Sequence, residues 1–446
     1  MTIHHPPKLA HRFFRWYCHP KLVDNIEGDL LEVYQERVRT IGKRHADLRF
    51  NFDVLSLFKR NIIRPVEGIK TLNTFGMFKS YFTLGWRNIL RSKGYAFLNI
   101  SGLAIGLTAA ILILLWVQNE TSYDGFHTKA DRTYQLFSRD LNNGKLDVWG
   151  YTPALMAPEL IQSYGEVDDA VRQRVVFFLL KAGENRFNEM GAFTDPGFLT
   201  MFSFGLLEGQ ANALQDDFGI VLSRAMAIKL FGTVDCLGQT VTVNDNDSFK
   251  VTAVMEDLPR NTSFDAFTFL LPWKYFTRLG WDQNQTWATT NTGTYVSLKD
   301  PGDAGSFDAK LNGIVKSHVK DGEGSTREVF IHPLTKLHLY SKAENGQLTG
   351  GRHETVTMFS IIAGLIVLIA CINFINLSTA RSEKRSREVG VRKIAGAHRS
   401  SLVMQFLVES TLLVAFAFVI AMILVTLSLP LFNRALNTSL TLELVQ

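Results

Sequence analysis

The chain has 446 residues, of which 46% are hydrophobic and 20% are charged, and its formal net charge is +5. These values are ordinary for two or three soluble domains, but the charged residues are unevenly distributed along the chain. The three cysteines, Cys18, Cys236 and Cys371, lie in separate regions, so their spacing indicates neither a disulfide framework nor a metal cluster.

Residues 1–75 carry both signs of charge and predict a small helical module on the cytoplasmic side of a membrane. Apolar side chains recur there at the spacing of a helix face, at Leu22, Ile26, Leu30, Leu31 and Tyr34. No chemistry is indicated by these residues, so we expect the module to dock a partner or to pack on the membrane part. Because the first apolar run comes so late, we expect no cleavable signal peptide.

Residues 76–118 predict an amphipathic helix followed by the first transmembrane helix. Within residues 77–93, apolar and aromatic side chains share one face, and polar side chains four apart occupy the other: Lys79, Thr83, Arg87 and Arg91. A helix of this kind, placed directly before an apolar run, is typical of one that lies at the membrane surface in contact with lipid.

Three runs of the sequence contain no Lys, Arg, Asp or Glu: residues 94–119, 355–380 and 410–433. Each run spans roughly 36–39 Å as a helix, which exceeds the ~30 Å hydrocarbon core of a bilayer. Buried helices of a soluble core are the alternative, but core helices of that length normally have a polar face. We therefore predict an α-helical transmembrane bundle, with its second and third helices within residues 355–434.

Five residues in or beside these runs are candidates for helix packing. Gly102 and Gly106 are four apart in the first run, which permits close approach of a neighbouring helix. Asn373 and Asn376 lie toward the end of the second run, where buried amides can bond across helices. Glu409 opens the third run, and we expect it to pair with a basic residue of the preceding loop.

The charges that flank the apolar runs orient the predicted spans. Four basic residues precede the first run, whereas Glu120 and Asp124 follow it. Seven basic residues follow the second run: Arg381, Lys384, Arg385, Arg387, Arg392, Lys393 and Arg399. Positive charge marks the cytoplasmic side, so we place the N-terminus and residues 381–400 inside and residues 119–354 outside. Residues 435–446 then begin an outer loop.

Residues 119–354 predict a large extracytoplasmic α+β domain. The segment GQTVTVNDNDSFKVTAVM alternates as two strands joined by a turn at residues 244–247, and SRAMAIKLFG predicts a short helix that ends near Gly232. No nucleophile elbow occurs, and the histidines lack metal-ligand spacing, so we expect these side chains to be structural or exposed: His127, His318, His332, His338 and His353.

An anchor at anionic lipid would explain the positive charges of residues 381–400. It would not explain why the motif EVGVRKIAGA places Gly390 and Gly396 among those charges. The sequence lacks a phosphate-binding GxxxxGK[ST] loop, so ATP-driven work would depend on a partner, and this cytoplasmic loop is the candidate contact. Since glycine weakens a helix, we expect a short helix, a turn and then the third span.

The segment SREVGVRKIAGAHRSSLVMQFLVES resembles the signature of the FtsX/MacB-type permeases of ABC transporters. The matching positions are Glu388, Val389, Gly390, Val391, Arg392, Lys393, Gly396, Ala397, Phe406, Leu407, Glu409 and Ser410. WRNILRSKGYAFLNISGLAIGL is similar to the first-span signature of the same family. YDGFHTKADRTYQL, VLSRAMAIKLFG and VTAVMEDLPRNTSF resemble its periplasmic core domain, and the N-terminal module resembles a permease prefix domain.

This resemblance implies a non-enzymatic permease subunit in the bacterial inner membrane, which passes the motion of a separate ATPase to a periplasmic domain. ATP would be bound by that partner, so no cofactor is expected in this chain. The resemblance also implies a dimer of permease units and a periplasmic adaptor, with export or extraction of peptides, drugs or lipoproteins, and no nucleic acid. The implied ATPase contact comprises Arg385, Glu388, Val389, Gly390, Val391, Arg392, Lys393, Ile394, Gly396 and Ala397.

The family pattern has four spans per unit, and the fourth is missing from this sequence, so we expect the chain to be a piece of a longer permease. The same architecture suits a membrane-anchored regulator or sensor that activates periplasmic partners such as cell-wall hydrolases. A membrane-tethered hydrolase is a third alternative, and it would need a site without a familiar motif.

Overall fold

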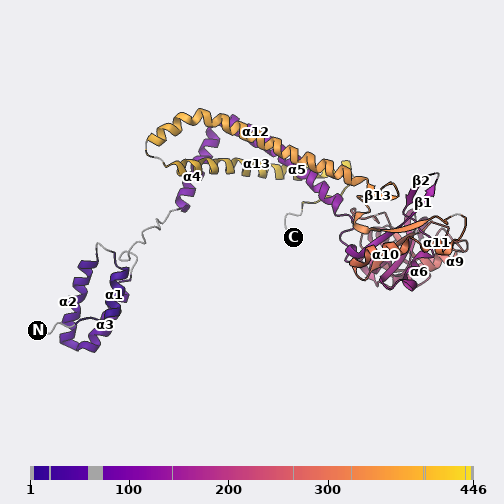
Figure 1. Ribbon diagram of the computed structural model, residues 1–446, viewed down its shortest axis with the longest axis horizontal. Helices are drawn as coiled ribbons and strands as arrows, with labels where there is room; N and C mark the ends of the chain where they lie inside the picture. Colours follow the sequence, from indigo (N-terminus) through magenta and orange to yellow (C-terminus); the bar gives the residue numbers. More distant parts are fainter. Residues whose placement is uncertain are drawn as a thin grey trace. The chain divides into compact units, whose positions relative to one another are not determined.

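The computed structural model describes residues 5–19, 22–58, 74–142, 144–264, 266–322, 324–394, 396, 398–436 and 438–442 (Figure 1). The chain divides into two compact units. The first comprises Met1–Arg91 with Ala397–Ser410, and the second comprises Ser92–Gly396 with Thr411–Gln446. Each unit is considered by itself.

The first unit begins with three helices: α1 (Lys8–Tyr17), α2 (Val23–Ile41) and α3 (Lys43–Ser56). Two tyrosines link them, because the Tyr17 hydroxyl donates to the Val54 carbonyl at 2.7 Å and the Tyr34 hydroxyl donates to Asp47 at 2.7 Å. The rest of their small core is mostly aromatic and aliphatic: Phe14, Cys18, Ala46 and Phe50.

Helix α4 (Thr74–Arg91) also belongs to the first unit, and its side chains are described from residue 81 onward. Ile89 is buried, whereas Phe82, Trp86 and Leu90, each four residues apart, are exposed. An exposed stripe of large apolar side chains along one helix is the feature expected of a helix that lies at a membrane surface.

Within the described residues, three helices are long and apolar enough to cross a membrane: Lys93–Thr121, Arg352–Ala380 and Arg399–Leu436. They coincide with the three predicted spans and correspond to α5 (Lys93–Thr121), the first part of α12 (Arg352–Ile394) and α13 (Arg399–Leu436). In the second unit, apolar residues of these helices meet in a packed cluster that contains Leu103, Ala104, Ala370 and Ala417.

The chain between α5 and α12 folds into an α+β domain around one mixed sheet of 11 strands (Figure 1). Its main order is β11-β1-β10-β3-β4-β9-β6-β8-β5, while β2 pairs with β1, and β7 pairs with β3 and β8. The strands are β1 (Thr133–Asn142), β2 (Lys145–Trp149), β3 (Val167–Ala182), β4 (Asn185–Thr194), β5 (Leu206–Gly209), β6 (Gly219–Ser223), β7 (Thr240–Val243), β8 (Asp247–Met255), β9 (Phe269–Pro272), β10 (Gly293–Leu298) and β11 (Glu328–Pro333). A separate hairpin, β12 (Lys342–Glu344) and β13 (Gln347–Gly350), precedes α12.

The long strand β3 joins two halves of this sheet, since it pairs with β10 along its first part and with β4 and β7 along the rest. Around β1, β10 and β11, the core includes Leu136, Val296 and Phe307. Around β6, β8 and β9, it includes Leu222 and Phe249. The helices of the domain are α6 (Met156–Ser163), α7 (Phe198–Met201), α8 (Arg224–Phe231), α9 (Trp273–Arg278), α10 (Ala304–Leu311) and α11 (Ile314–His318).

Two local predictions in this domain are confirmed. The turn between β7 and β8 contains Asn244 and Asp245 with φ of +52° and +55°, a left-handed conformation that Asn and Asp tolerate better than most residues. Helix α8 begins after Ser223, whose hydroxyl accepts from the Met226 N–H, and ends at Gly232 with φ of +76°. Side-chain capping and a left-handed glycine explain both boundaries.

Candidate functional site

The loop predicted between the second and third spans is mainly a continuation of α12. The helix runs without interruption through Gly390 and ends at Ile394, after 43 residues. The turn contains Gly396, whose φ is +87°, and α13 begins at Arg399. The expected separate short helix was therefore wrong: one glycine costs a helix only ~1 kcal/mol relative to alanine, too little to break a helix of this length.

The end of α12 presents apolar side chains to its surroundings. Val391 is 68% exposed and Ile394 is 90% exposed, and they lie three residues apart, on the same side of the helix. Val389 and Gly390 are half-buried, and Gly396 is exposed. The side chains of five other predicted contact residues lie outside the described part: Arg385, Glu388, Arg392, Lys393 and Ala397.

Gly102 and Gly106 lie where α5 meets α12. A Cβ atom at Gly106 would lie 2.9 Å from the Cβ of Ala370, and a Cβ at Gly102 would lie 3.1 Å from the Asn373 amide nitrogen. A separation of 2.9 Å is too short for two carbon atoms, so glycine at position 106 is what allows this closeness.

Asn373 and Asn376, the two asparagines predicted to take part in helix packing, lie on α12. Both residues are exposed, and neither amide has a hydrogen-bond partner among the described residues. The Asn373 amide approaches α5 at Gly102, and the packing role of Asn376 stays a prediction.

Glu409 lies in the first unit together with α4, and it is only 5% exposed. Its Oε2 accepts a hydrogen bond of 3.3 Å from the Asn88 side-chain amide of α4. Most basic side chains of the loop that we expected to pair with Glu409 lie outside the described residues. The pairing of Glu409 with a basic residue therefore stays a prediction. The Asn88 contact links α4 to the beginning of α13.

A cluster of charged contacts in the second unit lies where the membrane helices join the α+β domain. Glu120, in the last turn of α5, is 1% exposed. Its Oε2 lies 2.6 Å from His338 Nε2 and accepts a 2.5 Å hydrogen bond from Nε of Arg352, the first residue of α12. Tyr123 stacks on the His338 ring with a centroid separation of 3.4 Å. We refer to Glu120, His338 and Arg352 as the junction clamp.

The junction clamp joins three segments that are far apart in sequence. A carboxylate removed from water is stable only when charged or hydrogen-bonded partners compensate for the lost solvation, and Glu120 has two. Because each partner comes from a different segment, the end of α5, the chain before β12 and the start of α12 are held together. Displacement of either helix end would leave a charged group unpaired.

A second buried carboxylate, Asp124, lies four residues after Glu120 and is 0% exposed. Its φ is +56°, and its oxygens accept hydrogen bonds from the Thr262 hydroxyl at 2.5 Å, the Ser263 N–H at 3.0 Å and the Ser263 hydroxyl at 2.6 Å. The His127 Nε2 atom lies 3.7 Å away from Asp124. These contacts connect two segments quoted above for their resemblance, YDGFH and NTSF.

The environment of Asp124 changes its acidity. Burial by itself raises the pKa of this carboxyl group, whereas the neighbouring His127 and the donors of Ser263 and Thr262 lower it. The lowering effects prevail, so that the pKa lies below its ordinary value. The site is therefore arranged around an ionised carboxylate, which fixes the chain directly after α5.

The sequence signalled these residues only as charges that follow or precede an apolar run. Glu120 and Asp124 served as markers of orientation, and Arg352 lies three residues before the second apolar run. A charge directly at the end of an apolar helix is a weak signal of a junction contact. The partners His338, Thr262 and Ser263 had no recognisable signal, because only the folded sheet brings them to the helix ends.

Comparison with known families assigns the α+β domain and the helical region that follows it. Residues 96–314 match the MacB-like periplasmic core domain, and residues 360–445 match the FtsX-like permease C-terminal domain. The chain belongs to the FtsX/MacB-type family of ABC transporter permeases. The α+β domain is accordingly the periplasmic domain of a membrane permease, and α12 and α13 fall in its FtsX-like region.

Curated relatives are distant and longer. The "Probable syringafactin export ATP-binding/permease protein SyfD" of Pseudomonas syringae pv. syringae is 23% identical over 360 residues, 78% of this chain and 52% of that protein. The "Uncharacterized ABC transporter permease YknZ" of Bacillus subtilis is 26% identical over 194 residues, 43% of this chain and 44% of that protein. The chain thus spans about half the length of the curated relatives it matches.

Among solved structures, the periplasmic region of MacB from Actinobacillus actinomycetemcomitans matches 46% of this chain and 90% of its own length. Its identity is 16% and its TM-score is 0.35. The extracellular domain of the transporter YknZ from Gram-positive bacteria matches 44% of this chain and 99% of its own length, with 15% identity and a TM-score of 0.34.

Proposed function

We propose that the chain is the permease subunit of an ABC transporter and carries the motion of a separate ATPase subunit across the inner membrane to its periplasmic domain. The motion would drive export or extraction of a peptide, drug or lipoprotein. The N-terminal module and the end of α12 would face the cytoplasm, and the complex would contain a dimer of permease units, with a periplasmic adaptor as a further partner.

One observation carries the proposal: α12 is a single helix from the junction clamp to the turn at Gly396. At 1.5 Å per residue, such a helix is about 64 Å long, roughly twice the thickness of the hydrocarbon core. Its first residue, Arg352, is bound to Glu120, and its last turn exposes Val391 and Ile394. A continuous helix transmits displacement, whereas a flexible tether would absorb it.

The exposed pair at the end of α12 would form the apolar centre of the proposed contact with the ATPase. Val391 and Ile394 offer apolar surface, and the surrounding sequence supplies Arg392 and Lys393. An apolar centre with a charged rim is the usual composition of a protein–protein contact. We therefore assign the ATPase-facing surface to this last turn of α12 and the turn that follows.

Affinity purification of the tagged full chain from its native membranes tests the proposal. We expect an ABC ATPase subunit to co-purify and to hydrolyse ATP in the complex. The double substitution Val391→Asp and Ile394→Asp should abolish co-purification, whereas Leu141→Asp, at a 60% exposed position on β1, should leave it unchanged. Recovery of a periplasmic hydrolase without any ATPase would favour the regulator instead.

The orientation of the chain can be tested separately. In a cysteine-free background, Asp245→Cys should react with a membrane-impermeant thiol reagent applied to spheroplasts, and Ser386→Cys should react only after the membrane is permeabilised. The opposite labelling pattern would contradict both the orientation and the proposed position of the ATPase.

A further inference from the structure

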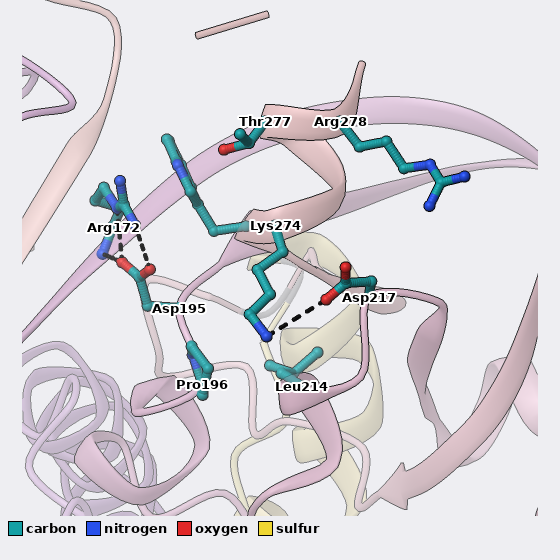
Figure 2. Close-up of a pocket in the computed structure, with 9 residues that line it drawn as sticks. Arg172, Asp195, Pro196, Leu214, Asp217, Lys274, Thr277 and Arg278 are labelled. Carbon is teal, nitrogen blue, oxygen red and sulfur yellow. Dashed lines mark hydrogen bonds and ion pairs between the residues drawn. The ribbon is translucent and has the colours of Figure 1, made fainter. Parts of the chain in front are cut away.

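A cavity of about 570 Å³ opens on the periplasmic domain beside α9 (Figure 2). Its lining comes from four separate segments: Arg172 on β3, residues 195–196 after β4, residues 214–217, and α9. Figure 2 shows Lys274, Thr277 and Arg278 projecting from α9 in different directions: Lys274 points toward Asp217, and Arg278 points away from the Arg172–Asp195 pair. A volume of this size lies in the usual range of sites for small organic ligands.

One wall of the cavity is electrically neutral and rigid. Asp195 accepts hydrogen bonds from the Arg172 backbone N–H at 2.8 Å, from Nε at 2.9 Å and from Nη2 at 2.6 Å. The Arg172 guanidinium also lies 4.4 Å from the ring centroid of Trp273. Both charges of this pair are satisfied, so the wall contributes shape and apolar surface more than net charge.

The opposite wall carries an excess positive charge. Lys274 Nζ lies 3.4 Å from the Asp217 carboxylate and donates to the Gln215 carbonyl at 3.2 Å. Arg278 has no carboxylate partner among the described residues, and its guanidinium lies 4.5 Å from the ring centroid of Phe218. The cavity therefore has three cationic and two anionic side chains in its lining, and the unmatched charge belongs to Arg278.

A neighbouring cavity of about 350 Å³ provides an internal contrast. It shares Arg172, Asp195 and Pro196 with the first cavity, but beyond them its lining adds Asp169 and no further Lys or Arg. The cationic character is thus confined to the α9 side of the Arg172–Asp195 pair, so it is a local property of one cavity.

We propose that the α9 cavity binds the carboxylate of a small amphiphilic ligand, such as a short peptide with a free C-terminus and apolar side chains. Arg278, the lining cation without a carboxylate partner among the described residues, contacts the carboxylate, and Leu214 and Trp273 contact the apolar part. This inference rests on the proposed transport function and names the chemical class of its substrate.

The test measures binding of two fluorescent probes, dansyl-Leu-Leu with a free carboxylate and its C-terminal amide, to the full chain in zwitterionic lipid nanodiscs. We expect the wild-type chain to bind the acid at least about tenfold more tightly than the amide, the usual effect of a charge-assisted hydrogen bond. Arg278→Gln should remove this preference while leaving the affinity for the amide unchanged.

Arg224→Gln is the matched control, because Arg224 is an exposed arginine on α8 outside the cavity lining. It removes the same charge and should keep the preference for the acid. Arg278→Lys should also keep this preference. If it does, the loss in the glutamine variant comes from the missing charge and not from a general folding defect.

Equal binding of acid and amide by the wild-type chain, or equal losses in the Arg278 and Arg224 glutamine variants, would overturn the proposal. Neither result would affect ATPase co-purification, which tests the proposed function independently.

Discussion

The two ends of α12 differ in how they are held. At the periplasmic domain, Arg352 binds the buried carboxylate of Glu120, and His338 binds the same oxygen. At the other end, Val391 and Ile394 are largely exposed. One end is fixed to its own chain, and the other presents the surface that a partner protein would cover.

This difference indicates a division of roles within one helix. A helix fixed at both ends to its own chain could not respond to a partner, and a helix free at both ends could not move a domain. The Glu120 contacts supply the fixed point, since a carboxylate as deeply buried as Glu120 resists the loss of its partners. Under the proposed function, the exposed end would be the point at which an external force acts, and the following predictions test each end in turn.

The largest effect is expected from loss of the fixed point by Glu120→Ala. The substitution leaves Arg352 and His338 without their shared acceptor, and we expect the free energy of unfolding of the periplasmic domain to fall by about 3 kcal/mol. Denaturant unfolding of the purified full chain, followed by tryptophan fluorescence, measures this change. Glu184→Ala, at an exposed position in the β3–β4 turn, should have almost no effect; similar losses in the two variants would contradict a specific clamp.

The next effect concerns the continuity of α12. Gly390→Pro removes a helical hydrogen bond and costs ~3 kcal/mol locally, so we expect substrate transport coupled to ATP hydrolysis to fall more than tenfold. Gly390→Ala should preserve or slightly increase transport, because alanine favours the helix and its Cβ meets no atom within 4 Å. Transport by the complex reconstituted in vesicles is the measurement. If the proline variant worked normally, the helix would not be the transmitting element.

A smaller effect is expected between the two ends, where α5 packs on α12. Gly106→Ala places a Cβ at 2.9 Å from Ala370, so the helices must separate, at a cost of about 1–2 kcal/mol. Gly364→Ala, in the same helix as Ala370 but without an atom within 4 Å of the new Cβ, should be neutral or stabilising. Thermal unfolding in detergent compares the two variants, and an equal response would argue against close packing at Gly106.

The smallest effect is a pH dependence at the fixed end. The pKa of Asp124 lies below its ordinary value of 3.8 in the folded chain, so its ionised form stabilises the fold at higher pH. That contribution is lost as the pH falls through the ordinary value toward the folded pKa. Between about pH 5 and about pH 3, we expect Asp124→Asn to show a flatter decline in unfolding free energy than the wild-type chain. Parallel curves in denaturant titrations would contradict this assignment.

Features governed by local sequence could be predicted, and those governed by distant contacts could not. The apolar runs gave three helices, and Asn244–Asp245 gave the turn between β7 and β8, because each depends on residues adjacent in the chain. We did not predict that α12 continues through Gly390. One glycine destabilises a helix only slightly, and the rest of this long helix outweighs that cost.

The junction and the α9 cavity were beyond sequence reasoning for the same reason. Glu120 and Arg352 are separated by the entire periplasmic domain, and nothing near either residue indicates the other. Arg278 and Arg172 reach one cavity only because β3 and α9 are brought together by the folded sheet. Long-range pairs of this kind become visible when the tertiary structure is known.

The hydrogen bond between Glu120 and Arg352 also has a consequence for modularity. It shows that the periplasmic domain begins and ends at neighbouring points, so the domain is an insertion between two helices with closely spaced attachment sites. Insertions with adjacent termini are readily exchanged or produced alone. The segment between these two residues therefore has the geometry of an inserted domain, which suits it to exchange among homologous permeases.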